Sequence, residues 1–496
     1  MNQKRTASKA IMVVGTTSHA GKSMIVTALC RILRRRGMSV VPFKGQNMAL
    51  NSYVTPAGAE MGYAQVVQAW AAGLTPSVVM NPILLKPQGN MTSQVVLMGK
   101  PVDYVQAADY YEKYFDRGWK IITECLDQLG SEYQMIVCEG AGSPAEVNLK
   151  HRDLTNMRVA EYLHAKTLLV VDIDRGGAFA HIVGTLQLLE PSERELIQGI
   201  IINKFRGQRS LLDSGITWLE EHTGIPVVGV IPWVELNLPA EDSLSLFDRR
   251  TTGTAPADIR IAVIRLPRIA NFTDFDPLDA ESTVQLDYIG LNQPLGHPDA
   301  VILPGTKTTI PDLLALKESG MAQNIQDYIA AGGQVMGICG GYQMLGQTIT
   351  DPQGLEGHPG EYDGLKLLPI KTMIDRQKIS TKRVVTSAYP QAGFPIKGYE
   401  IHQGRTQVLD RETATPLFEE TNLGVINQSQ SIWGHYLHGI FDNSAWRRAW
   451  LNHLRKPRGL NTLPTGVPDY REHREMMLDV LADVVADSLN LDLILR

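Results

Sequence analysis

The sequence predicts an α/β fold in two tandem domains, and three observations lead to this fold class. Apolar runs typical of buried parallel strands alternate with helix-capable segments from Ile11 to Pro232. A polar stretch with Gly and Pro then interrupts the alternation, and a new series of strands begins at Ile259. Alternation of this kind is typical of doubly wound parallel sheets. The expected parts are a doubly wound domain at 1–248, a linker at 249–258, a second α/β domain at 259–446 and a helical tail at 447–496.

The composition excludes several classes of protein. The chain has 496 residues, of which 44% are apolar and 20% charged, as in ordinary globular proteins. Its formal net charge of -5 indicates no affinity for nucleic acid or for a membrane surface, and no apolar run reaches transmembrane length. The four cysteines form no Cys-x-x-Cys pair, which suits a reducing compartment. Together with an N-terminal stretch that lacks a signal-peptide pattern, these features predict a cytoplasmic protein.

The first predicted strand leads into a glycine-containing loop, residues 15–23, that is typical of phosphate binding. The backbone N–H groups of such a loop and the N-terminus of the next helix cradle phosphate oxygens. Lys22 can reach these oxygens, and the Ser23 hydroxyl can bind Mg²⁺. Gly15 and Gly21 are one residue further apart than in the common form of the motif. We expect ATP and Mg²⁺ at this loop, with Gly15, Thr16, Gly21, Lys22 and Ser23 as nucleotide-binding residues.

Further polar residues follow other predicted strands at the carboxyl edge of the sheet, where open α/β sheets bind ligands. Glu139 ends one strand and is a candidate Mg²⁺ ligand or water-orienting group. Asp172, after the next strand, is a candidate metal ligand near the expected phosphates. The candidate substrate contacts are uncharged residues in loops and turns near this edge: Asn47, Asn51, Gln94 and Asn148.

The second half of the chain contains a strand-to-helix turn with a cysteine at its apex, Gly337-Ile338-Cys339-Gly340-Gly341. The glycines suit a sharp turn that leaves no room for side chains. A thiol at a helix N-terminus is favoured as the thiolate, because the helix dipole stabilises negative charge there. We therefore predict that Cys339 is a nucleophile rather than a buried structural cysteine.

The stretch Gly-Ile-Cys-Gly-Gly-Tyr-Gln-Met-Leu-Gly resembles the nucleophile turn of class I glutamine amidotransferases. The resemblance implies a flavodoxin-like domain that hydrolyses glutamine and releases ammonia. It also implies an oxyanion hole made by the N–H of Gly340 and that of Gly305 or Thr306. The Tyr-Leu-His-Gly motif then makes His438 the base that activates Cys339, and His435 is expected to pack or to contact substrate.

The orienting carboxylate of such a site is not evident in the sequence. Many triad amidotransferases have Glu two residues after the base, and this chain has Ile440 there. The carboxylate is thus missing or comes from elsewhere, with Glu400 and Asp442 as candidates. A bare Cys-His pair would give slower glutamine hydrolysis, because the imidazole would be less firmly oriented. Another polar loop, with Asn271, Asp274 and Asp276, follows the strand that begins at Ile259.

The longer phosphate loop is similar to that of dethiobiotin-synthetase-like ATPases, which phosphorylate a carboxylate. This resemblance implies that Lys44 is a second lysine facing the phosphates. It also implies that Asn203, in an Asn-Lys pair after a strand, contacts the nucleotide base. Members often have Asp after the following Arg-Gly, whereas this chain has Gln208, so the base preference stays open.

The order of the motifs over nearly the whole chain resembles the cobyric acid synthase family of cobalamin biosynthesis. These motifs are Lys-Gly-Gln-Asn-Met-Ala-Leu-Asn, Ser-Gln-Val-Val, Asp-Ile-Asp-Arg-Gly-Gly, Asn-Lys-Phe-Arg-Gly and Tyr-Leu-His-Gly. The resemblance implies an ATP- and glutamine-dependent ligase that amidates the b, d, e and g carboxylates of adenosylcobyrinic acid a,c-diamide, a corrinoid. The expected product is adenosylcobyric acid, and L-glutamine is the expected donor of ammonia.

Three other interpretations stay open at this point. The chain could be a cobyrinic acid a,c-diamide synthase, which has the same two-domain logic and amidates two carboxylates. It could belong to a lipid II amidating system, although there the two activities usually lie on separate chains. From a different class, it could be a regulatory P-loop ATPase with an inert glutaminase-like module, which the intact Cys339 and His438 argue against.

Overall fold

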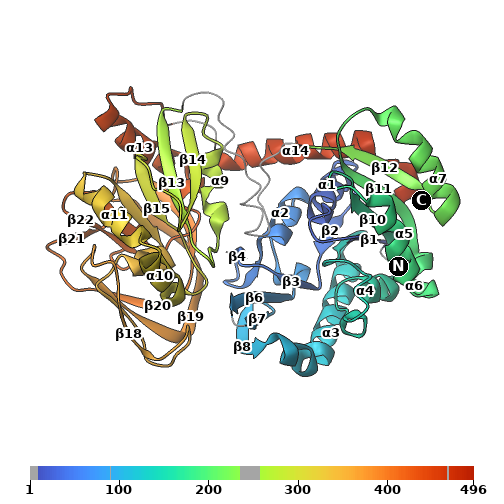
Figure 1. Ribbon diagram of the computed structural model, residues 1–496, viewed down its shortest axis with the longest axis horizontal. Helices are drawn as coiled ribbons and strands as arrows, with labels where there is room; N and C mark the ends of the chain where they lie inside the picture. Colours follow the sequence, from blue (N-terminus) through green and yellow to red (C-terminus); the bar gives the residue numbers. More distant parts are fainter. Residues whose placement is uncertain (1–8, 90, 235–256, 466–468, 496) are drawn as a thin grey trace, which may run out of the picture.

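The computed structural model describes residues 9–89, 91–234, 257–465 and 469–495. Two lobes lie side by side, the first built from the N-terminal half and the second from residues after 257 (Figure 1). A long C-terminal helix runs from the second lobe back across the first, so that both ends of the chain lie in the first lobe (Figure 1). The predicted linker at 249–258 lies outside the described residues except for Ala257 and Asp258.

The first lobe is built around a six-stranded sheet in the order β12-β11-β10-β1-β9-β2, in which all neighbours are parallel. Its strands are β1 (Lys9–Gly15), β2 (Val40–Phe43), β9 (Met135–Glu139), β10 (Lys166–Asp172), β11 (Ile197–Phe205) and β12 (Val227–Pro232). Along β1, Met12 and Val14 pack into one apolar core, and Ile11 and Val13 into another. Successive strand residues point to opposite faces, so helices must cover both. This confirms the predicted doubly wound sheet.

The helices of the first lobe cover the two faces of this sheet (Figure 1). They are α1 (Lys22–Arg35), α2 (Tyr63–Ala71), α3 (Ala107–Glu132), α4 (Met157–Leu163), α5 (Ala178–Leu188), α6 (Pro191–Leu196) and α7 (Asp213–Thr223), with short 3₁₀ turns η1 (Val78–Met80), η2 (Lys150–Arg152) and η3 (Arg209–Leu211). Helix α1 buries Ile25, Leu29 and Leu33, which recur every four residues and so form one stripe. That stripe holds the helix N-terminus at the end of β1.

Between β2 and α3 the chain adds small strands that extend the first lobe toward the second (Figure 1). One sheet has the order β3-β6-β7-β8, and β4 pairs with β5. Their bounds are β3 (Gln46–Met48), β4 (Ser52–Val54), β5 (Glu60–Gly62), β6 (Ile83–Gly89), β7 (Thr92–Leu97) and β8 (Lys100–Gln106). Residues of β4 contact the second lobe: the Tyr399 hydroxyl donates to the Ser52 carbonyl at 3.2 Å.

The second lobe has a seven-stranded sheet in the order β14-β13-β15-β16-β23-β22-β21. Its strands are β13 (Ile259–Arg265), β14 (Val284–Gly290), β15 (Ala300–Leu303), β16 (Val335–Ile338), β21 (Ala414–Pro416), β22 (Gly424–Asn427) and β23 (Ile432–His435). The first five strands in this order are parallel. Numbered in chain order among themselves, they read 2-1-3-4-5. This is the flavodoxin-like order, as predicted.

Further elements complete the second lobe. A second sheet, β18-β17-β19-β20, consists of β17 (Thr348–Asp351), β18 (Gly360–Asp363), β19 (Ile370–Thr386) and β20 (Pro395–Val408). The helical segments are η4 (Phe272–Phe275), α9 (Asp276–Asp279), α10 (Thr309–Glu318), α11 (Met321–Ala330), α12 (Gly340–Met344), η5 (Ile440–Asp442), α13 (Ser444–Arg455) and η6 (Lys456–Arg458). Glu400, a candidate for the orienting carboxylate, lies within the long strand β20.

The C-terminal region serves both lobes. Trp446 and Trp450 of α13 are buried in the core of the second lobe, so this helix spans the expected end of that domain at 446. Helices α14 (Tyr470–Ser488) and α15 (Leu491–Leu495) pack on the first lobe instead. There Arg31 of α1 donates to Asp479 at 2.8 Å and to Glu475 at 2.9 Å. The last two helices therefore pack against the first lobe.

Candidate active sites

The phosphate loop lies at the carboxyl end of β1 and runs directly into α1. Gly21 is the residue before the helix and has φ 104°, a left-handed conformation that glycine adopts without strain. A Cβ atom at Gly21 would lie 2.0 Å from Nδ2 of Asn203, so the loop also needs glycine for space. The Lys22 ammonium donates to the carbonyls of Thr17 and Gly142, at 3.0 and 2.9 Å. The lysine is thus curled over the loop, where phosphate oxygens would be expected.

Glu139 brings the predicted nucleotide and metal residues together at the end of β9. Its Oε1 accepts from the Ser23 hydroxyl and from the Lys44 ammonium, each at 2.8 Å. Its Oε2 accepts from the amides of Gln68 and Gln65 of α2. Glu139 and Lys44 are almost completely buried, so a carboxylate is maintained there by its ammonium and amide partners.

The surroundings of Glu139 fit a Mg²⁺ site. A hydroxyl oxygen and a carboxylate oxygen lie side by side, and Mg²⁺ prefers oxygen ligands, of which the protein usually supplies only one or two beside the phosphates. Within the described parts of the chain, no group of three or more His, Cys, Asp or Glu could hold a metal ion by itself. The residues therefore suit an ion that arrives with a nucleotide rather than an all-protein metal centre.

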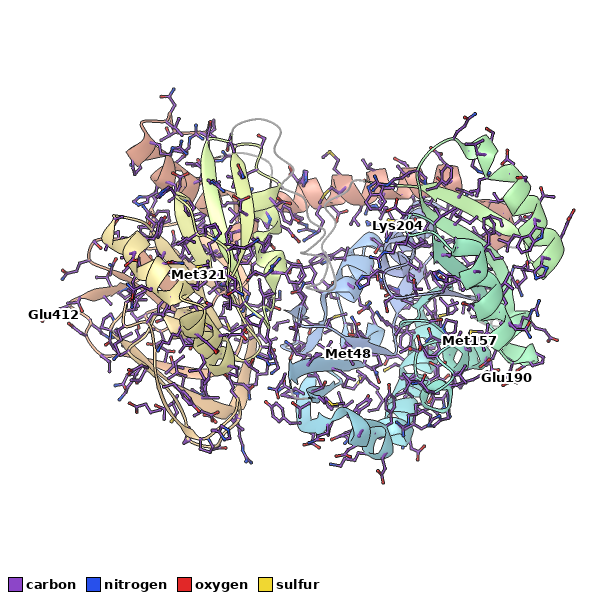
Figure 2. The ribbon with its side chains drawn as sticks, in the orientation of Figure 1. Met48, Met157, Glu190, Lys204, Met321 and Glu412 are labelled. Atoms are coloured by element: carbon purple, nitrogen blue, oxygen red, sulfur yellow. The ribbon has the colours of Figure 1, made fainter. Side chains whose placement is uncertain are left out.

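Asp172 lies at the neighbouring strand end but has a different partner. Its Oδ2 accepts from the Lys204 ammonium at 2.7 Å, and Lys204 also donates to the carbonyl of His19 in the phosphate loop (Figure 2 labels Lys204). Asn203 donates through Nδ2 to the Ala20 carbonyl at 2.8 Å. Both residues of the Asn-Lys pair therefore hold the phosphate loop. Among the described residues Asp172 makes no hydrogen bond to Ser23 or Glu139, so the geometry favours Glu139 over Asp172 as the metal-side carboxylate.

The predicted substrate residues lie in different environments. Asn47 and Gln94 are buried: Asn47 donates to Gln65 at 2.9 Å, and Gln94 donates to the Tyr104 hydroxyl at 2.7 Å and accepts from Lys378 of the second lobe at 3.4 Å. Asn51 is completely buried at the contact with the second lobe, where its Oδ1 accepts from the Phe272 N–H at 3.1 Å. Asn148 is exposed in the loop after β9. The structure therefore does not gather these four residues into one surface, and it gives Asn51 an interdomain position.

Cys339 lies between β16 and α12 with φ 52° and ψ −106°. A non-glycine residue in such a strained conformation is typical of a nucleophile turn, because the strain exposes the side chain at the end of the strand. The flanking glycines are required for space: a Cβ atom at Gly341 would lie 2.0 Å from the Leu303 carbonyl oxygen. Cys339 is one of four free cysteines among the described residues, and it lines a pocket.

The partner of the second-lobe histidine corrects the sequence-based expectation. Nδ1 of His438 lies 2.6 Å from Oδ2 of Asp274, and Oδ1 of Asp274 accepts from the Gly439 N–H at 2.9 Å. The third carboxylate is therefore neither missing nor Glu400 nor Asp442. Glu400 instead bonds Nε2 of His402 at 3.1 Å and the Arg383 guanidinium. Of the two possibilities that the sequence left open, a missing carboxylate or one from elsewhere, the geometry agrees with the second, because η4 brings Asp274 from a distant loop to the base.

Charge at this histidine is stabilised by its neighbours. Burial opposes a positive imidazole, but the Asp274 carboxylate, with a smaller effect of the Cys339 sulfur, raises the pKa of His438 to about 10. Among the described residues Nε2 of His438 has no hydrogen-bond partner, which leaves that nitrogen available toward the site. His435 behaves oppositely: burial and repulsion by His438 lower its pKa to about 3, and it stacks on Trp433 in the core.

The predicted oxyanion-hole residues lie against this pair. A Cβ atom at Gly305 would lie 3.2 Å from Cε1 of His438 and 3.8 Å from Cβ of Cys339. A Cβ atom at Gly340 would lie 3.2 Å from the backbone nitrogen of Thr306. Glycine thus allows the two turns to approach each other closely beside the sulfur, and the backbone N–H groups of Thr306 and Gly340 lie near one another.

A pocket opens beside Cys339 at the contact between the two lobes. Its wall includes Cys339, His438, Gly305 and Gln343 from the second lobe and Lys86 from the first. The complete lining is Lys86, Ala270, Asn271, Gly305, Thr306, Lys307, Thr309, Cys339, Gln343, Glu356, Lys378, Ile401, His402, Gln403, Gly404 and His438. The glutaminase-like site therefore faces the ATPase-like domain rather than open solvent alone.

Comparisons with known proteins agree with this arrangement. Residues 11–245 match the CobQ/CobB/MinD/ParA nucleotide binding domain, and residues 260–446 match the CobB/CobQ-like glutamine amidotransferase domain. The chain is 66% identical over 490 residues to the cobyric acid synthase of Trichormus variabilis, covering 98% of this chain and 100% of that protein. It is 62% identical over 489 residues to that of a Synechocystis strain, covering 98% of each.

The chain belongs to the cobyric acid synthase family. The family expectation and the fold class stated from the sequence are thereby confirmed. The first domain is a nucleotide-binding domain of the CobQ/CobB/MinD/ParA type, as expected from the phosphate loop. Among the residues the structure describes, no helix is long and apolar enough to cross a membrane.

Sequence reasoning missed Asp274 as the partner of His438. The available signal was weak: Asp274 is one acidic residue in a polar loop at the end of a strand, 164 residues before the base. It also missed Lys307 and Glu356 in the pocket wall, because nothing in their local sequence marks them. By contrast, Cys339, His438, Gly305 and Gly340 were each placed by their motifs.

Proposed function

We propose that this chain converts adenosylcobyrinic acid a,c-diamide to adenosylcobyric acid by amidating its b, d, e and g carboxylates with ammonia from L-glutamine, at the expense of ATP. The observation that carries the proposal is the 66% identity to a cobyric acid synthase along its entire length. The geometry supports it, because each domain retains a complete set of residues for its half of the reaction. The residue roles below are part of the proposal.

Glutamine hydrolysis takes place at Cys339. The thiolate attacks the carboxamide carbon of glutamine, and the negative oxygen that forms is stabilised by N–H groups of Gly340 and of the Gly305–Thr306 turn. One such donor is worth about 3 kcal/mol. His438, held by Asp274, gives its proton to the amide nitrogen of the intermediate, which leaves as ammonia, and a glutamyl thioester remains. His438 then accepts a proton from the water that hydrolyses the thioester, which releases glutamate and regenerates the thiol.

Carboxylate activation takes place at the phosphate loop. Lys22 and the loop N–H groups bind the phosphates of ATP, with Lys44 as a second cation. Ser23 and Glu139 would hold Mg²⁺, and the bound ion would neutralise charge that develops during transfer. A corrin carboxylate attacks the γ-phosphorus and becomes an acyl phosphate, while the bond from the γ-phosphorus to the bridging oxygen breaks and ADP leaves. Ammonia then attacks the carbonyl carbon and phosphate leaves, so that one amide forms for each ATP and glutamine consumed.

The position of the pocket suggests how ammonia is used. Lys86 of the first domain forms part of the wall beside Cys339, so ammonia is released at the contact between the domains. We infer that it passes to the acyl phosphate without mixing with bulk solvent. An enzyme that consumes free ammonia, added in excess, is expected to leave glutamine-driven amidation unchanged. A strong reduction of amide formation under these conditions would contradict an internal path.

The experiment that tests the function is mass spectrometry of the corrinoid after incubation with the protein, Mg-ATP and glutamine. Each conversion of a carboxylic acid to an amide lowers the mass by about one unit, so four successive steps are expected. Cys339→Ala should lose all four steps with glutamine and regain them with ammonium salts. No change of mass with the wild-type protein would refute the proposal, and two steps from cobyrinic acid instead would indicate the sibling diamide synthase.

A further inference from the structure

The pocket beside Cys339 also has charged residues in its wall. Three lysines contribute to its wall: Lys86 from β6, Lys378 from β19 and Lys307 from the loop after β15. Glu356, in the loop between β17 and β18, lines the same pocket. The proposed chemistry at Cys339, His438 and the oxyanion hole uses none of these four residues.

Two of the lysines share one carboxylate. The carboxylate of Glu60 accepts from the Lys86 ammonium at 2.6 Å and from the Lys378 ammonium at 2.5 Å. Lys86 also donates to the Ser52 hydroxyl at 2.9 Å. All three side chains of this cluster are nearly inaccessible to solvent, at 1 to 6% exposure, and a buried charge needs such partners.

Lys307 differs from its two neighbours. Its ammonium forms no hydrogen bond or ion pair with any residue that the structure describes, and it lies over the Tyr104 ring, 5.9 Å from the ring centroid. Burial, with repulsion by the ammonium groups of Lys378 and Lys86, lowers the pKa of Lys307 well below its usual range. A lysine in this position is therefore short of an anion, which a ligand in the pocket would supply.

Glu356 provides the opposite charge. Its Oε2 accepts from the Ile310 N–H at 2.8 Å, at the start of α10, so the carboxylate is held in place. Burial raises the pKa of Glu356, against the effect of that N–H and of Lys307. The lining thus offers a carboxylate and an ammonium group in the same pocket as Cys339.

We infer that Lys307 binds the α-carboxylate of glutamine and Glu356 its α-ammonium group, so that the two residues select the free amino acid for Cys339. The inference rests on the proposed glutaminase activity. Lys307 follows the Gly305–Thr306 turn directly, so one loop carries both an oxyanion donor and the cation for the far end of the substrate. A glutamine side chain that enters with its amide at Cys339 leaves its charged end in the remaining pocket, where these residues lie.

The test combines variants with truncated substrates. 4-Aminobutanamide lacks the α-carboxylate of glutamine, and glutaramate lacks the α-ammonium group. In the wild-type protein, both should be hydrolysed with kcat/KM at least 10-fold below that of L-glutamine, since a hydrogen bond to a charged group contributes a factor of about 10 to 100. Lys307→Met should raise KM for glutamine by about 10- to 100-fold with little change in kcat.

Each variant should lose selectivity for one group only. Lys307→Met should hydrolyse glutamine and 4-aminobutanamide with similar kcat/KM, yet still reject glutaramate. Glu356→Gln should show the reverse pattern, and Lys307→Arg should recover much of the affinity for glutamine. Lys366→Met is the matched control, because Lys366 is an exposed lysine of the same domain that pairs with Asp363 at 3.0 Å, and it should behave as wild type.

Two results would overturn the inference. One is an unchanged KM for glutamine in Lys307→Met, and the other is an equal loss of kcat with all three substrates, as a structural role would give. Calorimetric titration of Cys339→Ala with L-glutamine separates this from a failure of the proposed function. Suppose that Lys307→Met weakens glutamine binding in this background, while the wild-type protein forms no corrinoid amide. These results would refute the proposed function and retain the subsite.

Discussion

Oδ2 of Asp274 lies 2.6 Å from Nδ1 of His438, although 164 residues separate the two in the chain. The second oxygen of the same carboxylate accepts from the N–H of Gly439, so it fixes both the ring and the backbone beside it. This arrangement orients Nε2 of His438 toward the nucleophile side of the site. In the proposed glutaminase site, the carboxylate beside the base therefore comes from the η4 segment rather than from the residues next to the base.

Asp274→Asn should reduce kcat for glutamine hydrolysis by about 10³- to 10⁴-fold, as expected when the orienting carboxylate of a triad is lost. Glu400→Gln, at the candidate that the structure pairs with His402, should cost less than about 10-fold. Glutamate release measured by a coupled assay distinguishes the two. A larger effect of Glu400→Gln would mean that the carboxylate assignment is wrong.

The same pair links the activity to pH. The pKa of His438 is raised to about 10. The imidazolium that protonates the leaving nitrogen should therefore persist through neutral pH and be lost as pH rises through about 10. The pH profile of glutaminase kcat should therefore decline only on that alkaline side, and any residual activity of Asp274→Asn should decline at lower pH. The stability contributed by His438 is likewise complete below its unfolded pKa of 6.5 and lost toward pH 10. An alkaline limb at the same pH in both proteins would contradict this assignment.

Gly21→Ala should abolish ATP-dependent amidation while glutamine hydrolysis persists. The added Cβ would lie 2.0 Å from Nδ2 of Asn203, which itself holds the phosphate loop through Ala20. Gly37→Ala is the matched control, because Gly37 also has a positive φ, of 79°, but nothing lies within 4 Å of its added Cβ. Isothermal titration with ATP should show weakened binding for Gly21→Ala alone. Equal loss in both variants would trace the effect to backbone strain rather than to the loop.

Glu60→Gln should destabilise the protein by about 3 to 5 kcal/mol, since it leaves the buried ammonium groups of Lys86 and Lys378 without a counter-charge. Adding Lys378→Met to Glu60→Gln should recover part of this loss. Burial opposes the charge on Glu60, but the two lysines lower its pKa below the usual 4.5, so its contribution is present above pH 4.5 and lost as pH falls. Denaturant unfolding at pH 7 and at pH 4 measures both effects. A constant difference between wild type and variant over this range would contradict the charge argument.

Leu481→Ala should lower the free energy of unfolding of the first domain by about 2 to 5 kcal/mol. Leu481 of α14 is completely buried in the core that α14 shares with α1. Val480→Ala, at a neighbouring position with 43% exposure, should change stability by less than about 0.5 kcal/mol. Scanning calorimetry of the whole chain compares the two variants. Similar melting temperatures for both would show that the C-terminal helix does not support the first domain.

Much of the fold could be predicted because its signals are local. Buried strands such as β1 and β10 are short continuous apolar runs, and the glycines of the phosphate loop and the Cys339 turn mark sharp turns at strand ends. Since parallel strands place their carboxyl ends at one sheet edge, the sequence could also predict that Lys22, Ser23 and Glu139 lie together. The motif resemblance likewise predicted that Cys339 and His438 lie together in one site.

Other parts of the site depended on contacts between distant segments. Asp274 reaches His438 only because η4 and the end of β23 meet, and Lys86 joins the Cys339 pocket only because the two lobes pack together. Asn51 resembled a substrate residue in sequence, yet its Oδ1 accepts from Phe272 across the same contact. Helix α14 was predicted as part of a helical tail, but its packing partner α1 could not be predicted from the sequence.

The sequence alone thus determined the strand series, the two reactive turns and the family, because strand burial, turn geometry and catalytic spacing are properties of neighbouring residues. Tertiary structure alone decided which carboxylate lies beside His438, which lysine of the pocket has no hydrogen bond or ion pair in the described part of the chain, and where the C-terminal helix packs. The physical reason is that hydrogen bonds and ion pairs depend on distances of a few ångströms, and side chains hundreds of residues apart acquire these distances only when the domains fold and meet.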